Sequence, residues 1–445
     1  MPTSTPFQKS WFTQVVDQMR ERFTGLTDKR TGRNARYGLC DAALSAFSVF
    51  FLQCASFLEF QRRMQLHEAQ NNVHTLFGAY QIPCDNQIRN LLDAVEPKEL
   101  DGVYDFMFDG LQTAGVLEQY RFLQGRLLLA LDGVTYFSSD AVHCKQCSER
   151  THADKTSYHH SVVTPVLVCP EQDKVVCLPP EFITPQDGND KQDCELRASQ
   201  RWLQHHGARY AGLKTVVLGD DLYCHEPFCR ALREQGFEFV LVCKPSSHPT
   251  TYEWLEMLQK AGQVHSLIKR RWTGLHMETD TYQYASSVPL RDGDDALMVD
   301  WCELRTTNET GQLCYHNSFS SSLPVTQANV VDVVAAGRAR WKIENENNNT
   351  LKTKGYHFEH NFGHGHDHLA SVLLSLVILA FLLHTMLQWL DERFKVLRSI
   401  VPSRKVLFND LRALASYMCF ESWSALVEFM IRGWSQSRKS VRLRL

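Results

Sequence analysis

The sequence lacks a strong charge imbalance, an N-terminal secretory signal, tandem repeats and long low-complexity tracts. Its formal net charge of −3 argues against a uniformly basic, nucleic-acid-coating protein. The opening MPTSTPFQKSWF contains no apolar segment that would direct secretion, so we expect the fourteen cysteines to be free thiols in a reducing cytoplasm. With 44% apolar and 22% charged side chains over 445 residues, the chain is expected to be globular, with two or three domains.

One apolar run is long enough to span a bilayer. The segment LASVLLSLVILAFLLHTMLQWL, residues 369–390, contains no charged residue. It does contain polar residues, and it lacks the flanking Lys/Arg asymmetry of a membrane anchor. We therefore predict a buried core helix and no membrane partner, with a membrane-anchored protein as the alternative.

Local patterns divide the chain into five segments. Residues 1–122 are predicted to form an α-helical domain that could bind DNA, because basic residues outnumber acidic ones in the first forty. Residues 123–249 show the order strand, strand, strand, helix, strand, helix, strand (βββαβαβ). Short β-branched pieces between turns predict a β-rich antiparallel insertion over 250–326. Helix is predicted for 327–390 and for 391–445, which ends in a basic tail.

Three acids occupy positions where a metal site could be assembled. Asp132 ends the first strand (LLLALD), Asp220 ends the fourth (VVLGD), and Glu344 lies on the later helix in RWKIE. Strands one and four are neighbours in a βββαβα core, so the acids at their ends can meet. Because a buried carboxylate is costly unless it has a partner, a divalent cation is the natural one, and carboxylate oxygens suit Mg²⁺ or Mn²⁺.

A plainer interpretation is that Asp132 and Asp220 are strand-end turn residues and Glu344 is a solvated helix acid. The surroundings of Glu344 favour the metal site. Arg340 lies one helical turn before it and Lys352 two turns after it, roughly on one face, as expected beside a phosphate backbone.

The run RWKIENENNNTLK, together with an Asp ending strand one, an Asp ending strand four and a β-rich insertion before the Glu helix, resembles the DDE transposases of bacterial insertion sequences. The resemblance covers about residues 126–385. It implies a ribonuclease H-like fold in the α/β class, with Asp132, Asp220 and Glu344 as the metal-binding triad. It also implies that Arg340 and Lys352 contact DNA near the transposon end.

Two departures from the family pattern matter. The family's usual Tyr three residues before the Arg is Gly337 here, and Lys352 is one residue further from Glu344 than the common spacing. Glu346 is therefore an alternative for the helix acid, and Asp221 is a possible substitute for Asp220.

A cluster of thiols and imidazoles follows Asp132. His143, Cys144 and Cys147 have the ligand types and the CxxC spacing of tetrahedral zinc, with His152 or His160 as the fourth ligand. The expected role is structural, to fix the loop between strands one and two. Unligated thiols are the alternative.

Three further features fit ordinary structural roles. Asp193 and Glu195 of KQDCE suit the first turn of a helix. Lys269, Arg270, Arg271 and Trp272 suit either phosphate contact with base stacking or a solvated strand face. The segment HNFGHGHDH, residues 360–368, resembles a metal-binding tract, but its position before the apolar helix favours a polar connecting loop.

These observations predict a transposase that binds the inverted-repeat ends of its element, cuts them with Mg²⁺ or Mn²⁺ and joins them to target DNA. A homodimer is expected in the transposition complex, in a bacterial cytoplasm near the nucleoid. A metal-dependent nuclease without strand transfer and a DNA-binding protein that has lost its chemistry are the alternatives.

Overall fold

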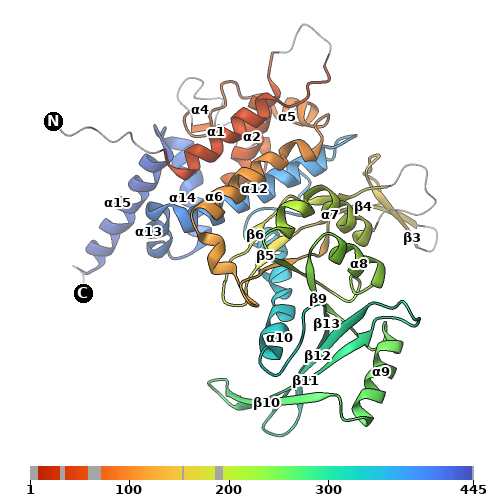
Figure 1. Cartoon of the computed structure of the whole chain (residues 1–445). Helices are drawn as coiled ribbons and strands as arrows, with labels where there is room; N and C mark the ends of the chain where they lie inside the picture. The colour runs from red at the N-terminus through yellow and green to blue at the C-terminus, as the bar shows by residue number, and fades with distance from the viewer. Residues whose placement is uncertain (1–8, 31–35, 59–71, 153–154, 186–193, 443–445) are drawn as a thin grey trace, which may run out of the picture.

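The computed structural model describes residues 9–30, 36–58, 72–152, 155–185 and 194–442 (Figure 1). The protein is a mixed α/β molecule, as predicted. Asp193 lies outside the described residues, and so do the side chains of the basic tail from residue 436 onward.

The main sheet has nine strands in the spatial order β10-β11-β12-β13-β9-β8-β1-β5-β6. Its central strand β1 runs parallel to β8 and antiparallel to β5, and β8 runs parallel to β9. The strands of this part of the sheet are β1 (Leu127–Ala130), β5 (Val166–Val168), β6 (Val176–Cys177), β8 (Thr215–Gly219) and β9 (Glu238–Val242). All residues of β1, β5 and β8 are buried, which fits their continuous apolar sequences.

Four long antiparallel strands extend the same sheet beyond β9. They are β10 (His265–Trp272), β11 (Met277–Pro289), β12 (Met298–Asn308) and β13 (Leu313–Ser321). Helix α9 (Pro249–Lys260) packs on β11, where Leu255, Val288 and Trp301 belong to a small apolar cluster of their own.

One long hairpin contributes strands to two sheets, since β1 pairs with β5 in the main sheet and the strands between them pair in a smaller sheet. After a break at Leu131 and Asp132, the chain continues as β2 (Gly133–Ser139), which pairs with β4 (Lys155–Val163). Strands β3 (Ser148–His152) and β7 (Glu181–Ile183) also pair with β4. Asp132 therefore lies where the chain leaves the main sheet and enters the smaller one.

Helices pack against both sheets. Helix α7 (Glu195–Ala211) contacts β4 and β7, and α8 (Glu226–Glu234) contacts β9. Helix α10 (Val330–Ala339) contacts β8, β9 and β12, and leads into a π-helical turn, η3 (Ile343–Asn348), and α11 (Asn349–Thr353).

Helices from both ends of the chain form one layer at the top of Figure 1. The N-terminal contribution is α1 (Trp11–Thr24), α2 (Leu39–Phe51), α4 (Asn72–Thr75), α5 (Asp85–Leu92), η1 (Pro97–Leu100), α6 (Asp101–Thr113) and η2 (Val116–Tyr120). The C-terminal contribution is α12 (Leu369–Leu390), α13 (Glu392–Ile400), α14 (Arg404–Tyr417) and α15 (Trp423–Arg442). The buried Asn72 amide joins the two sets by donating to the carbonyls of Ala415 and Met418.

Helix α12 lies at the centre of this layer, in contact with α1, α2, α5 and α6. It has the length and apolarity of a membrane span, yet 94% of its most apolar window is buried inside the protein. Some of its polar groups are paired inside the protein, since the backbone carbonyl of Ser375 accepts from the Tyr104 hydroxyl and Nδ1 of His384 bonds to the Tyr356 hydroxyl. These contacts are those of a core helix.

Candidate functional site: an acid cluster and a Cys/His cluster

Asp132 and Asp220 lie level with each other at the ends of two adjacent parallel strands. In the β1/β8 ladder Ala130 is the partner of Leu218, so each acid follows its strand by the same two residues. Both strands are apolar and fully buried up to that point. The fold therefore places two carboxylates side by side at the edge of a dry core.

The electrostatics of Asp132 show which groups surround it. Burial and, to a smaller extent, the carboxylates of Glu195, Glu344 and Asp220 together raise the pKa of Asp132 to about 7, while Arg340 opposes them. The three acids predicted from the sequence thus act on one another. Their oxygens are spaced more widely than the ligands of a single ion, because no group of three or more acids within the described residues has all its ligand atoms within 4.8 Å.

Glu344 lies on the π-helical turn η3, held by its neighbour Arg340. The Arg340 guanidinium, whose side chain is 11% exposed, donates to Glu344 Oε1 at 2.8 Å. Irregular π-helical turns often occur at functional sites because they aim a side chain that a regular helix would turn away. Lys352, in contrast, is exposed on α11 and forms an ion pair with Glu359 at 2.7 Å.

Two polar residues hold the π-helical turn against the sheet. Asn348 Oδ1 accepts a hydrogen bond of 3.0 Å from the hydroxyl of Thr164, and Asn347 Oδ1 accepts one of 3.2 Å from the thiol of Cys177. Both asparagines are buried. Asn347 and Asn348 therefore serve as packing contacts, whereas Asn345 and Asn349 of the same polar run are exposed.

The two alternative acids, Asp221 and Glu346, do not share the surroundings of Asp132. Asp221 turns toward the loop after β9, where it accepts from the N–H of Lys244 at 2.7 Å and from the hydroxyl of Ser247. Neither Asp221 nor Glu346 is among the groups that most affect the pKa of Asp132. The geometry therefore favours Asp220 and Glu344 over these substitutes.

A fourth acid, Glu195, belongs to the cluster although the sequence suggested only a helix-start role for it. Its carboxylate accepts from the hydroxyl of Tyr223 at 2.7 Å and from the N–H of Gly133, and burial raises its pKa. A Cβ on Gly133 would collide with the Glu195 carboxylate, so a larger residue there would displace this side chain from beside Asp132. An open groove of about 420 Å³ adjoins this point, lined by Gly133, Glu195 and Arg150 among others.

Gly337 lies in close contact with the sheet. A Cβ on Gly337 would lie 2.5 Å from the ring of Phe319, which is fully buried in β13. Helix α10 thus packs so closely on the sheet that any larger residue at 337 would collide with the ring.

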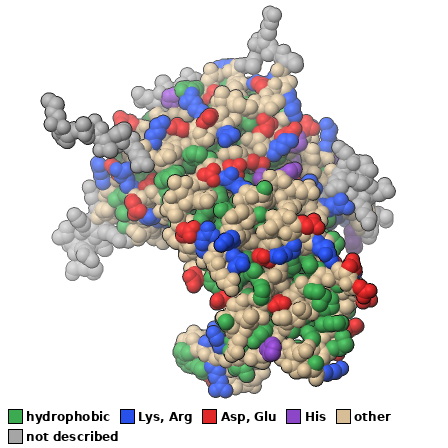
Figure 2. Space-filling model, in the orientation of Figure 1, with side chains coloured by type: hydrophobic (Ala, Val, Ile, Leu, Met, Phe, Trp, Pro, Cys, Tyr) green, Lys and Arg blue, Asp and Glu red, His purple; other side chains and the backbone are tan. Residues whose placement is uncertain are grey.

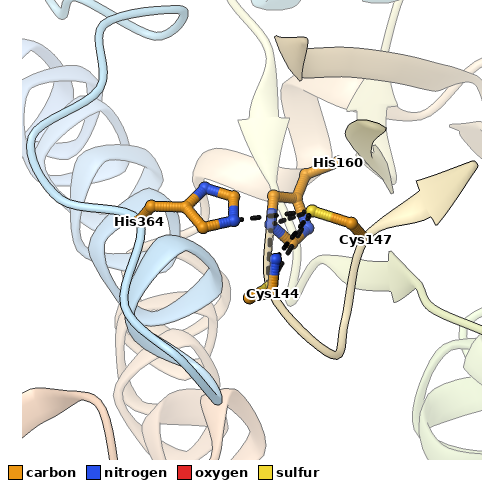
Figure 3. Close-up of side chains that lie close together, drawn as sticks. All are labelled: Cys144, Cys147, His160 and His364. Carbon is orange, nitrogen blue, oxygen red and sulfur yellow. Dashed lines mark hydrogen bonds between the residues drawn. The ribbon is translucent and has the colours of Figure 1, made fainter. Parts of the chain in front are cut away.

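The predicted zinc ligands are brought together in part. Cys144 and Cys147 at the tip of the β2/β3 connection lie beside His160 of β4, and their fourth neighbour is His364, from the segment before α12 (Figure 3). His143 is exposed and its ring stacks on Tyr158 at 4.4 Å, while His152 ends β3 outside the group. Burial lowers the pKa of His160 to about 4, which keeps this imidazole neutral at pH 7.

The remaining basic candidates line the outer strand. Residues Lys269 to Trp272 lie exposed on β10, and the Trp272 side chain is 62% exposed. The charge of Arg271 is countered by Glu278 and Asp280.

A scan against protein-family models and a search of the curated proteins found no match for this chain.

Proposed function

We propose that the protein is a DDE transposase that cuts and joins DNA with divalent metal ions. The observation that carries the proposal is the convergence of Asp132, Asp220 and Glu344 from two strand ends and one helical turn. Burial and the neighbouring acids, which only one arginine opposes, disfavour the ionised form of Asp132. Divalent cations bound among these acids would supply the missing positive charge.

The sheet supports the same proposal. Its strands β6-β5-β1-β8-β9 have the order and directions of a ribonuclease H-like core, with β1 at the centre. The antiparallel strands β10 to β13 lie between Asp220 and Glu344 along the chain, and we propose that they form the β-rich insertion.

In this mechanism Asp132, Asp220 and Glu344 would hold Mg²⁺ or Mn²⁺. The bound ions would supply activation of the attacking oxygen and stabilisation of the leaving oxygen at phosphorus. Arg340 orients Glu344 through its 2.8 Å hydrogen bond. Tyr223 and the Gly133 N–H hold the Glu195 carboxylate near Asp132.

The surface supports contact with a polyanion. Figure 2 shows Lys and Arg side chains gathered in a band across the middle of one face, between the helical layer and the strands β10 to β13. Arg150 lines the groove beside Glu195. We propose that DNA backbone lies along this band, with Lys352 and Arg340 near the cleaved phosphate and a second copy of the chain in the complex.

The test is an assay with purified protein, Mg²⁺ and DNA that carries the native element ends. Strand-transfer products support a transposase. Hydrolysis without joining indicates a nuclease, and binding without cleavage indicates a DNA-binding protein that has lost its chemistry.

A further inference from the structure

Two segments far apart in the chain meet at the Cys/His cluster. Cys144, Cys147 and His160 belong to the hairpin that leaves Asp132, whereas His364 belongs to the segment that enters α12. A second contact joins the same segments, since Lys145 forms an ion pair with Asp367 at 3.2 Å. The hairpin tip and the start of α12 are therefore held together, and the four side chains of Figure 3 point toward one another at that junction.

The distances between ligand atoms match the edges of a zinc tetrahedron. Zn–S bonds of about 2.3 Å and Zn–N bonds of about 2.0 Å give S–S edges of roughly 3.8 Å and S–N edges of roughly 3.5 Å. The two sulfurs are 4.0 Å apart, and Nε2 of His160 lies 3.5 Å from Cys144 Sγ and 3.4 Å from Cys147 Sγ. Nε2 of His364 lies 3.5 Å from Cys147 Sγ.

The backbone around the thiols is arranged as it is around metal-bound sulfur. The N–H of Gln146 donates to Cys144 Sγ at 3.4 Å, and the N–H of Cys144 donates to Cys147 Sγ at 3.5 Å. Such donors stabilise negative charge on sulfur and fix its direction. Thiols that merely fill a loop would not require both amides to turn toward them.

The approach of His364 depends on the glycine that follows it. Gly365 has a φ of +71°, and a Cβ there would collide with the carboxylate of Asp93. Asp93 in turn accepts from the N–H groups of 366, 367, 368 and 369 at the start of α12. His364 is thus presented by a segment whose backbone is fixed by an independent anchor.

A disulfide or a different metal cluster would account for less of this arrangement. A disulfide between Cys144 and Cys147 would give the two imidazoles no role, and both cysteines are free. A second group within the described residues, Cys224, Cys243 and His248, offers only three ligand atoms. A closed tetrahedral site needs four, and of these two groups the first supplies them.

We propose that Cys144, Cys147, His160 and His364 bind one Zn²⁺ as a closed structural centre that fastens the hairpin after Asp132 to the start of α12. Four protein ligands leave no position for water or substrate, and thiolate with imidazole is a poor ligand set for Mg²⁺, so the centre is structural. The zinc centre is independent of the proposed DNA chemistry. It can be tested on the protein alone, because zinc content is measured without DNA.

The test is elemental analysis of the full-length, tag-free protein. About one zinc per chain is expected for the wild type, and less than about a tenth of that for Cys147→Ser and His364→Ala. His143→Ala and His366→Ala are the matched controls, since both residues are exposed neighbours outside the group, and both variants should keep their zinc. Replacement of zinc by Co²⁺ should give the visible absorption of a tetrahedral site with sulfur ligands.

A ligand variant could lose zinc because it fails to fold or because it lacks a ligand, and His364→Cys distinguishes these two causes. This variant restores a fourth soft ligand and should recover zinc, whereas His364→Ala should not. Folded wild-type protein that lacks zinc would overturn the proposal. Zinc that persists in Cys147→Ser but disappears in Cys243→Ser would overturn it too, because the metal would then belong to the second group.

Discussion

The hydroxyl of Thr164 donates a hydrogen bond of 3.0 Å to Oδ1 of Asn348, while the N–H of the same threonine donates to the carbonyl of Asp132 at 3.1 Å. One residue therefore links the strand end that carries the first acid to the turn that carries Glu344. Both Thr164 and Asn348 are buried, so the link is shielded from water.

Thr164→Val should weaken this link without changing the volume of the side chain. Loss of a buried hydrogen bond costs about 1–2 kcal/mol in the free energy of unfolding, and we expect cleavage to fall at least as much as stability, because Glu344 loses its support. Denaturant unfolding and the cleavage assay measure the two effects. Thr135→Val is the control, since that exposed hydroxyl contacts only Ser161. Equal effects of the two variants would contradict the prediction.

The triad variants Asp132→Asn, Asp220→Asn and Glu344→Gln should each abolish cleavage while end binding remains largely intact. Each removes a charged metal ligand at nearly constant volume. Glu346→Gln and Asp221→Asn are the matched controls, and both should still cut. If Glu346→Gln were inactive and Glu344→Gln active, the assignment of the helix acid would be wrong.

Glu195→Gln should slow cleavage roughly tenfold or more and raise the metal concentration required, because a carboxylate beside Asp132 is lost. Gly133→Ala should reproduce this result by displacing Glu195, since its Cβ would collide with the carboxylate. Gly212→Ala, after the last turn of α7, is the control, because a Cβ there meets nothing within 4 Å. Full activity of Gly133→Ala would show that the position of Glu195 does not matter.

The stability of the protein without added Mg²⁺ or Mn²⁺ should depend on pH through Asp132. Its pKa is raised from 3.8 to about 7 by burial, so the folded state binds the proton more tightly than the unfolded state does. The associated stability is present below pH 4 and is lost as the pH rises through about 7. Asp132→Asn should therefore gain about 1–2 kcal/mol relative to wild type between pH 4.5 and 8, after allowance for solvent screening. If the difference in the free energy of unfolding between Asp132→Asn and wild type were the same at all pH values, this prediction would be wrong.

DNA binding should weaken steeply with salt, because phosphate contacts release counterions. Lys352→Ala should lower affinity for all sequences and reduce the salt dependence by about one released ion. Lys395→Ala is the control, because Lys395 pairs with Glu392 on α13, away from the acid cluster. Binding titrations at several salt concentrations decide the matter, and an unchanged slope for Lys352→Ala would count against a phosphate contact.

The strand-end acids were accessible from the sequence because apolar runs that stop at a carboxylate mark the edge of a buried sheet. The role of Glu195 was not, since it depends on the missing Cβ of Gly133 and on the hydroxyl of Tyr223. An acid in the first turn of a helix looks ordinary until the tertiary structure brings these partners to it.

The ligand set of the Cys/His cluster shows the same limit. The CxxC spacing of Cys144 and Cys147 is a local signal, and His160 is close in sequence. His364 joins them from a segment that sequence spacing alone favoured as a connecting loop. His143 had the right chemistry and position but stacks on Tyr158. Spacing identified the hairpin half of the site, and only the fold could supply the other half.

The packing of α12 against α1 and α2 has a consequence for synthesis of the protein on the ribosome. The first helices to emerge bury their apolar faces against a helix that is made more than three hundred residues later. Until then the face of α2 that meets α12 lacks its partner and can contact water or a chaperone, while α1 and α5 can already cover other parts of α2. A chain that stops before α12 cannot complete the helical layer.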